Sequence, residues 1–337
     1  MSRRRHAAAV GSLAAVTVAL LIPMLVAWLV GQAMRDRFMW SQFLFWVPAF
    51  MVFLAALACL AARGALRPQS RMRRPAMVLA GIALAVSGAR SARWEFGWRP
   101  WAPAPATGEV VVSHWNPQWP GREALACGRA LAPHLGDVCV LSNPGSITRS
   151  VVAGEWVPAG WHVADTGQFA VVSRHPIAEC ELLAVDHPPG VGMVWVGWTV
   201  VDVDGFGPLR ILSVDLPSNP RMARAASAAA IESVLARVLG DRIPDMVVGD
   251  VNATPGGLVT GALARFGHAA PPWASYGWLC TFERPWPLLR IDAMLASNAL
   301  VWRGYRSIDL AIGGHRMQQG TVARAGGRTG LTASAGR

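Results

Sequence analysis

An apolar run at residues 246–248 predicts a buried strand, and it leads into two polar side chains that could bind phosphate. Gly249, Asp250 and Asn252 follow the run. Because side chains alternate along an extended chain, the Asp250 carboxylate and the Asn252 carboxamide leave the strand end on one face. We expect Gly249 to let a ligand approach the backbone closely. This pair of groups suits a metal-bound oxyanion, although a plain Asp/Asn turn fits the stretch equally well.

Several other predicted strands also end in polar residues. The predicted strands cover residues 109–113, 137–143, 168–174, 191–203, 209–216 and 288–297. Helices are predicted at 122–135 and from Asn219 to Gly240. Asn116, Asn143 and Asp215 stand at or just after three of the strand ends, and these elements must bring them together.

The order of these motifs resembles that of the endonuclease/exonuclease/phosphatase family, which has the deoxyribonuclease I-like fold. Gly-Asp-Val-Asn at 249–252 is similar to the family's Gly-Asp-x-Asn, and Arg-Ile-Asp at 290–292 matches its Arg-Ile-Asp. Asp-Val-Cys-Val-Leu-Ser-Asn at 137–143 is similar to Asp-Val-Val-x-Leu-Gln-Glu, and Gly-Gly-His-Arg at 313–316 to Ser-Asp-His-Arg. The resemblance covers about residues 109–318. It implies an α/β fold, a four-layer α/β/β/α sandwich of two mixed sheets with helices outside.

The family hydrolyses phosphomonoesters or phosphodiesters with a divalent cation and a His–Asp pair. On the matching positions, the resemblance makes His315 the general base and Asp292 the residue that orients it. Asp250 and Asn252 would hold the water and the phosphate, and Asn116 would support the metal site. The expected cation is Mg²⁺, with Mn²⁺ as the alternative.

Three positions depart from the family's pattern. Asn143 stands where the family has its principal metal-binding Glu, and Gly314 where it has the Asp before the His. Asp215 stands where a His or Tyr usually bonds to the phosphate. Since a hard cation prefers carboxylates, we interpret the changes at 143 and 215 as coupled. The metal would then be displaced toward Asp215 and held by Asp215 and Asp250, with Asn143 as a neutral ligand and Asn116 in support.

The resemblance therefore predicts a hydrolase of phosphoric mono- or diesters. The departures leave open a catalytically degenerate domain that binds a ligand or partner at the membrane surface. A nuclease fits less well, because the net charge of +11 lies at the front of the chain. Residues 1–90 hold 11 Arg and one acid, whereas residues 91–337 hold 20 Arg and 19 acids. The nearly neutral domain lacks a basic groove for nucleic acid. A domain tethered to a membrane and facing outward would, from its location alone, favour a lipid headgroup, a phosphorylated small molecule or a scavenged phosphoester as the substrate.

Three apolar runs near the N-terminus predict an α-helical membrane anchor in residues 1–90. They cover residues 7–30, 43–62 and 75–89. A membrane span needs roughly 20 apolar residues, so the third run is short. A buried helix of a soluble domain is the alternative for that run.

The placement of arginine predicts how the anchor is oriented. Three Arg lie at 3–5 and five lie within 63–74, whereas only two, offset by Asp36, lie between the first two runs. Loops rich in Arg stay in the cytoplasm, so three spans place the following domain outside it. We expect a multi-pass cell-membrane protein with an extracytoplasmic C-terminal domain. If the third run does not cross, that domain is cytoplasmic.

Two further segments complete the expected organisation. Residues 91–108 predict a juxtamembrane linker, whose Trp and Phe side chains suit the membrane interface. Residues 319–337 predict a flexible tail, and 109–318 form the expected catalytic domain. The sequence leaves open the substrate, the oligomeric state and the disulfide state of four cysteines, Cys127, Cys139, Cys180 and Cys280.

Overall fold

The computed structural model describes residues 2–62, 73–101 and 104–326, with side chains from 15 onward and from 74 onward in the first two segments. The chain divides into two compact units. The first ends at Glu95 and the second begins at Phe96. Each is considered by itself.

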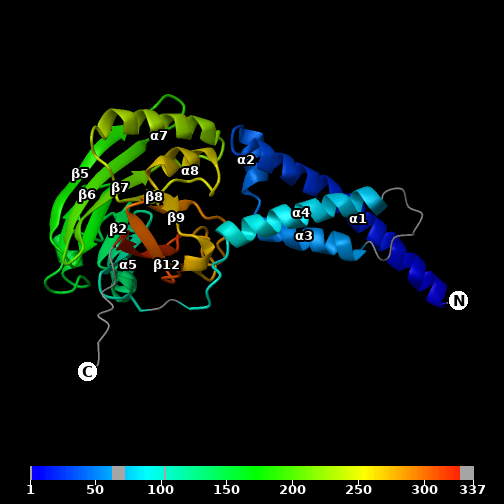
Figure 1. Ribbon diagram of the computed structural model, residues 1–337, viewed down its shortest axis with the longest axis horizontal. Helices are drawn as coiled ribbons and strands as arrows, with labels where there is room; N and C mark the ends of the chain where they lie inside the picture. The colour runs from blue at the N-terminus through cyan, green and yellow to red at the C-terminus, as the bar shows by residue number, and fades with distance from the viewer. Residues whose placement is uncertain (1, 63–72, 102–103, 327–337) are drawn as a thin grey trace, which may run out of the picture. The chain divides into compact units, whose positions relative to one another are not determined.

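The first unit is helical (Figure 1, blue to cyan). Its helices are α1 (Ser2–Met34), α2 (Met39–Trp46), α3 (Ala49–Ala62) and α4 (Arg73–Trp94). Two helices are long and apolar enough to cross a membrane, over Ala15–Met34 and Arg74–Trp94. The third expected run is therefore longer than residues 75–89. Large apolar side chains such as Leu20, Met24 and Val78 point outward, as they do when lipid surrounds a helix bundle.

The second expected span, residues 43–62, is not one straight helix. It is divided into α2 and α3, which meet at an angle of 71°. Only together are these two helices long and apolar enough to cross a membrane. Pro48 lies between them, and proline lacks the backbone N–H that a continuous helix needs. Glu95 accepts hydrogen bonds from the backbone N–H groups of Ala49 (2.6 Å) and Phe50 (2.9 Å) at the start of α3. The Trp28 indole donates to the Val47 carbonyl (3.2 Å), so side chains satisfy the interrupted backbone.

The second unit contains two mixed β-sheets. The first has the order β10-β12-β13-β1-β2-β4-β3. Its strands are β1 (Glu109–Trp115), β2 (Val138–Ser142), β3 (His162–Asp165), β4 (Phe169–Ser173), β10 (Ser275–Tyr276), β12 (Leu300–Ile308) and β13 (Met317–Arg324). The second sheet has the order β5-β6-β7-β8-β11-β9. Its strands are β5 (Ile177–Asp186), β6 (Val194–Val203), β7 (Gly207–Asp215), β8 (Met246–Asp250), β9 (His268–Ala269) and β11 (Asp292–Ala296).

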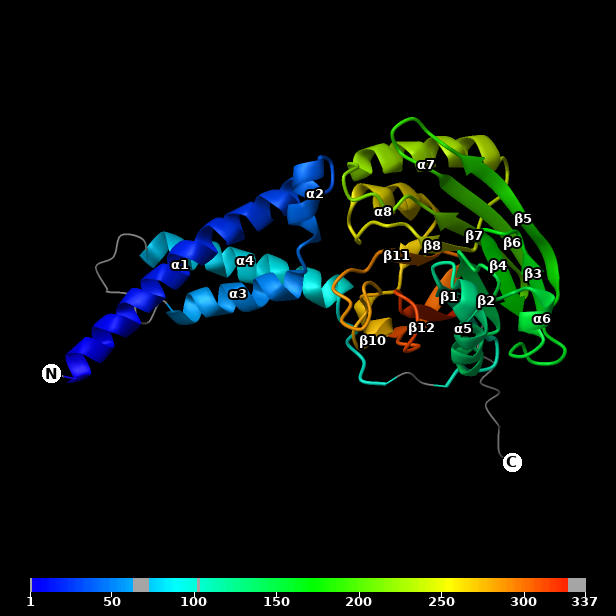
Figure 2. The same cartoon turned by 180° about the vertical axis from the view of Figure 1, so that it is seen from behind.

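The sheets pack face to face, and helices cover their outer faces (Figures 1 and 2). The core between the sheets joins Val112 and Val140 to Ile211 and Val248. The helices of this unit are α5 (Ala124–Leu131), α6 (Ser150–Ala153), α7 (Arg224–Val238) and α8 (Leu258–Leu263), with short 3-10 turns at Gly121–Glu123, Ala132–His134, Ala264–Phe266 and Pro272–Ala274. Apolar residues of α7 and α8 pack on the second sheet, and those of α5 pack on the first. The predicted α/β/β/α sandwich is confirmed.

The second unit extends beyond both ends of the predicted domain, residues 109–318. The tail was expected from residue 319, but β13 continues to Arg324 and pairs with β1 and β12 inside the sheet. Its alternating Gly, Val and Ala side chains are small, yet Val322 is fully buried. Residues 327–337 lie outside the described part of the chain.

The expected linker at 91–108 is also structured in part. Residues up to Trp94 complete α4, and Phe96 and Arg99 form β-bridges with Trp278 and Tyr276. A Cβ atom on Gly97 would lie 2.2 Å from the Ser275 carbonyl carbon, so only glycine permits this close approach. The helix expected from Asn219 begins instead at Arg224, because Asn219 accepts a hydrogen bond from the N–H of Arg221 in a tight turn. All five cysteines are free thiols.

Candidate active site

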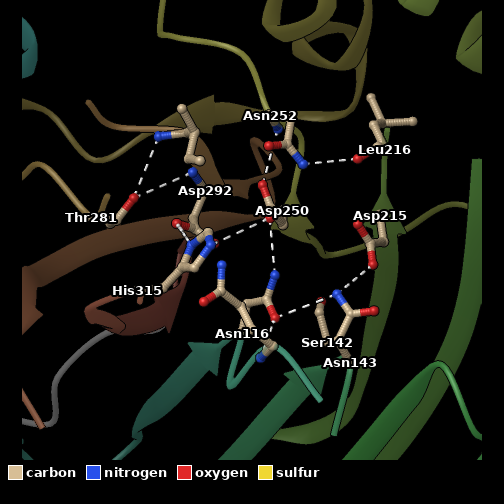
Figure 3. Close-up of polar contacts among 12 residues, drawn as sticks. Asn116, Ser142, Asn143, Asp215, Leu216, Asp250, Asn252, Thr281, Asp292 and His315 are labelled. Carbon is tan, nitrogen blue, oxygen red and sulfur yellow. Dashed lines mark hydrogen bonds and ion pairs between the residues drawn. The ribbon is translucent and has the colours of Figure 1, made fainter. Parts of the chain in front are cut away.

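Strand ends from both sheets meet at one place and carry the predicted site residues (Figure 3). Parallel strands β7 and β8 place Asp215 opposite Asp250, and antiparallel β11 places Asp292 on the other side of Asp250. Asn116 and Asn143 follow the parallel strands β1 and β2 of the facing sheet. The structure thus gathers residues that lie far apart in the sequence.

His315 reaches this place from the segment that precedes β13. Its Nδ1 atom lies 2.9 Å from Asp292 Oδ2, and its Nε2 atom lies 3.7 Å from Asp250 Oδ2. The ring packs against Phe282, with 4.9 Å between the ring centroids. His315 and both carboxylates are buried. Because the Asp292 carboxylate accepts from Nδ1–H, Nε2 is the nitrogen that faces Asp250.

A network of amides surrounds Asp215. Asn143 Nδ2 donates to Asp215 Oδ2 (2.8 Å), and Gln168 Nε2 donates to the same oxygen and to Asn143 Oδ1 (2.7 Å). Asn143 therefore presents its nitrogen to Asp215, and Gln168 occupies its oxygen. Asn143 has a left-handed backbone, with φ of 52°, which asparagine tolerates better than glutamate does.

Asn116 and Asn252 both bind Asp250. The Asn116 carboxamide donates to Asp250 Oδ2 (2.9 Å), and the backbone N–H of Asn252 donates to Asp250 Oδ1 (3.0 Å). The Asn252 carboxamide donates to the Leu216 carbonyl (2.8 Å). Asn252 thus ties β8 to β7 as well as facing the cavity.

The predicted reason for Gly249 is wrong. A Cβ atom at this position would lie 1.8 Å from the Val214 carbonyl oxygen. Glycine is required there because the β7 backbone, rather than a ligand, approaches closely. At Gly314 the near atoms belong to the end of the flexible Gln118 side chain, 2.3 Å from the Cβ position, so that side chain would have to move to admit a larger residue.

Three carboxylates and one imidazole make this site strongly coupled. Burial, followed by the neighbouring carboxylates, raises the pKa of Asp250 to about 8. Burial raises the pKa of Asp215 to about 7, although its amide partners lower it. Burial alone would lower the pKa of His315, but Asp292 and then Asp250 and Asp215 raise it to about 9. The pKa of Asp292 stays lowered despite its burial, because His315 stabilises its charge.

The donor set fits a hard divalent cation. Asp250, Asp292 and His315 offer ligand atoms that all lie within 4.8 Å of one another. Buried carboxylates that repel each other are a typical cation site, because the metal replaces the missing positive charge. Asp215, which the sequence predicted as a ligand beside Asp250, lies on the adjacent strand but is not in this group, and its Oδ2 accepts from Asn143 and Gln168. The amide oxygen of Asn143 would face such a cation only after its carboxamide turned over.

A cavity of about 810 Å³ opens onto these residues. Its walls consist of backbone, amides, carboxylates and apolar or aromatic side chains. They include Trp119, Val191, Met193, Trp195, Leu216 and Phe282. The cavity is large enough for a small organic ligand.

Sequence reasoning missed two residues that contact the predicted set. Gln168 begins the predicted strand at 168–174, and its polar side chain next to a strand end was a usable signal. His114 lies in a strand buried on both faces, with Nε2 3.0 Å from Ser142 Oγ and Nδ1 4.0 Å from Asp292 Oδ1. Burial lowers the pKa of His114 to about 4, so it is neutral. A single buried His in a strand gives no signal by itself.

No protein-family profile matches the chain, and no curated protein matches it in sequence. Solved structures are similar at low identity. An endonuclease/exonuclease/phosphatase protein of Beutenbergia cavernae is 17% identical, with 65% of this chain and 72% of that chain covered and a TM-score of 0.47. The 3'-5' exonuclease of Neisseria meningitidis is 17% identical, with 62% and 98% covered and a TM-score of 0.40. TDP2 of Caenorhabditis elegans is 11% identical, with 82% and 92% covered and a TM-score of 0.43.

Proposed function

We propose that this chain is a membrane-anchored, metal-dependent phosphoesterase. The observation that carries the proposal is the buried Asp292–His315 pair, whose Nε2 lies 3.7 Å from Asp250 Oδ2 at the wall of a cavity. A His that is oriented by a carboxylate and directed at an enclosed polar site is suited to general-base catalysis.

The residues have separate roles in this proposal. His315 Nε2 removes a proton from a water molecule that attacks phosphorus, and Asp292 stabilises the resulting imidazolium. Asn252 and Asn116 hold Asp250 by hydrogen bonds, and Asp250 orients the water together with His315. In the neutral imidazole, the buried Asp292 keeps the proton on Nδ1, so Nε2 is the nitrogen that can accept a proton.

Asp250 and Asp215 would hold the cation, with Asn116 and Asn143 as neutral neighbours. Mg²⁺ is the expected ion and Mn²⁺ the alternative, since oxygen ligands suit both. The cation would supply charge stabilisation for the phosphoryl oxygens. It would also balance Asp215 and Asp250, which lowers the pKa of His315 toward the range in which a base works.

A second candidate function is ligand binding without catalysis. It is favoured by the amide hydrogens of Asn143 and Gln168, which already satisfy Asp215. A carboxylate so bonded competes poorly for a metal. The buried Asp292–His315 pair argues against this function, because binding alone does not require a histidine that a carboxylate orients.

One experiment separates the two functions. The full-length protein in detergent is incubated with bis(4-nitrophenyl) phosphate and 4-nitrophenyl phosphate in the presence of Mg²⁺ or Mn²⁺. We expect metal-dependent release of 4-nitrophenolate that is lost in His315→Gln. His268→Gln, an exposed histidine outside the cavity, is the control and retains activity. Metal-independent turnover, or equal turnover in His315→Gln, would reject the proposed mechanism.

We also propose that the second unit lies outside the cytoplasm. The α2–α3 pair crosses the membrane as one broken span in this arrangement. If the pair instead entered and left on one side, the Arg-rich loop at 63–74 would face away from the cytoplasm, against the usual rule. Its substrate is then an extracytoplasmic phosphorylated small molecule or a lipid headgroup.

A further inference from the structure

The walls of the active-site cavity contain no cationic side chain apart from histidine. Among the described residues, twenty line the cavity, and none is an arginine. The whole chain has no lysine, and its 31 basic residues are all arginine. Histidine is present as His187 and His315 only. A phosphate in this cavity therefore meets no fixed guanidinium or ammonium group.

The site brings carboxylates rather than cations to the substrate. Asp215, Asp250 and Asp292 meet at neighbouring strand ends, and Asp215 and Asp250 line the cavity. In the proposed function a divalent cation would offset Asp215 and Asp250, and the described wall residues include no arginine to offset charge that the substrate adds. Each further negative charge on the substrate is therefore less well accommodated. A phosphomonoester carries close to two charges at neutral pH, whereas a phosphodiester carries one.

The rest of the wall is apolar and lies next to the catalytic residues. Trp195 is paired with Asp215 across β6 and β7, and Met193 lies two residues before it. Trp119 lines the same cavity and is 55% exposed, and its backbone N–H donates to the Asn143 carbonyl. Phe282 packs against the His315 ring. These side chains offer contact area to an organic group on the phosphate and no charge.

We infer that the substrate is a phosphodiester with a single negative charge and an apolar or aromatic substituent, rather than a phosphomonoester. The inference rests on the proposed function and narrows its substrate class. Hydrolysis forms one bond from water oxygen to phosphorus and breaks one bond from phosphorus to the leaving oxygen. His315 Nε2 takes the proton of the water.

The test compares three probes with the same leaving group in the full-length protein with Mg²⁺. Bis(4-nitrophenyl) phosphate has one charge and two rings, methyl 4-nitrophenyl phosphate has one charge and one ring, and 4-nitrophenyl phosphate has two charges. We expect kcat/KM to fall in that order, with the monoester at least about tenfold below the methyl diester. A monoester turned over as well as either diester would overturn the inference and leave the proposed function standing. Turnover of none of the three would reject the proposed function itself.

A binding measurement gives a readout that does not need turnover. Trp119 and Trp195 line the cavity, so ligands there should quench tryptophan fluorescence. We expect diphenyl phosphate to quench at a concentration about tenfold lower than phenyl phosphate does. Equal binding of the two would contradict the inference even in an inactive protein.

An added cation tests the charge argument directly. Met193→Arg places a guanidinium on the wall at a side chain that is 48% exposed, so the fold tolerates it. We expect the ratio of monoester to diester kcat/KM to rise by about tenfold. Ile243→Arg is the matched control, because Ile243 is 77% exposed and precedes β8 at the opposite end of that strand from Asp250. We expect this variant to leave the ratio unchanged. The same rise in both variants, or in neither, would contradict the inference.

Two sources share this chemistry, a membrane phospholipid and a free diester. Phosphatidylcholine in vesicles and water-soluble glycerophosphocholine carry the same headgroup, so comparing their hydrolysis distinguishes the two sources. Hydrolysis of the vesicle lipid alone assigns the lipid, and hydrolysis of the soluble diester alone assigns the free molecule. Hydrolysis of the vesicle lipid alone supports the whole inference. Hydrolysis of the soluble diester alone would overturn the apolar substituent, and cleavage of phosphocholine in place of both would overturn the diester class.

Discussion

At the scale of single residues, the site depends on one hydrogen bond that fixes a tautomer. Asp292 accepts from His315 Nδ1–H at 2.9 Å, so in the neutral imidazole Nε2 is the nitrogen that can accept a proton. Asp292→Asn keeps the shape but removes the charge that stabilises the imidazolium. We expect kcat for bis(4-nitrophenyl) phosphate to fall by about 10²–10⁴-fold, with KM nearly unchanged. Asp204→Asn, an exposed carboxylate that pairs with His175, is the control. A loss below tenfold would show that His315 does not need its partner.

The buried charges predict how stability depends on pH when no divalent cation is present. The folded-state pKa of His315, about 9, lies above its ordinary 6.5, so the stability it contributes is complete below 6.5 and lost as pH rises through about 9. Asp250 and Asp215 have folded-state pKa values of about 8 and about 7, raised from 3.8 mainly by burial, so the stability they contribute is complete below 3.8 and is lost as pH rises through those values. Stability therefore falls from about pH 4 to about pH 9.

Tryptophan fluorescence during heating measures this effect. We expect the unfolding midpoint to fall by several degrees over that window, at about 2–4 °C per kcal/mol. Mg²⁺ should reduce the fall, because it replaces the protons that balance the carboxylates. An equal fall with and without Mg²⁺ would mean that these carboxylates do not bind the ion.

The sequence predicted the chemistry of single residues better than their contacts. Asp250, Asn252, Asp292 and His315 were predicted from motifs because each motif is local. The role of Gly249 was mispredicted, because the atom that approaches it belongs to Val214 on another strand. Gln168 and His114 were missed for the same reason, since their partners lie on strands that only the fold brings together.

At the scale of secondary structure, strands were predicted more reliably than breaks and ends. Alternating or continuous apolar runs identify strands directly. The division into α2 and α3 depends on Pro48, and the extension of β13 to Arg324 depends on pairing with β1, which short Gly/Ala/Val segments do not reveal. The start of α7 was placed early, because Asn219 forms a turn rather than a helix cap.

Glu95 is predicted to stabilise the start of α3. Its carboxylate is buried and accepts from Ala49, Phe50 and Ser91. In Glu95→Ala, two backbone N–H groups lose their partner where little water replaces it. We expect the helical unit to lose about 1–3 kcal/mol of stability, measured as a lower unfolding midpoint in detergent. Glu155→Ala removes an exposed pair with Arg129 and should cost at most about 1 kcal/mol. Equal losses of stability in the two variants would contradict the role of Glu95 in capping α3.

At the scale of the whole molecule, arginine placement and the number of membrane crossings would decide which side of the membrane the second unit faces. Two full-length helices and one bent pair allow two or three crossings. Three crossings put the Arg-rich loop at 63–74 and the second unit on opposite sides. The prediction is that Ile243→Cys reacts with a membrane-impermeant maleimide in intact cells, whereas Ser70→Cys reacts only after permeabilisation.

The native protein provides the background for this labelling, since four of its thiols are buried and Cys180 is half-buried. Labelling of Ser70→Cys but not Ile243→Cys in intact cells would reverse the topology. Labelling of both residues, or of neither, would mean that the chain crosses the membrane an even number of times between residues 70 and 243.

The most direct test of the central claim is Mg²⁺ binding to the full-length protein by calorimetry, repeated with Asp250→Asn and Asp215→Asn. If the two carboxylates hold a catalytic cation, the wild type binds Mg²⁺ and each variant binds it at least about tenfold more weakly. No binding by the folded wild type, or equal binding in all three proteins, would contradict the account and favour a domain that binds its ligand without metal or catalysis.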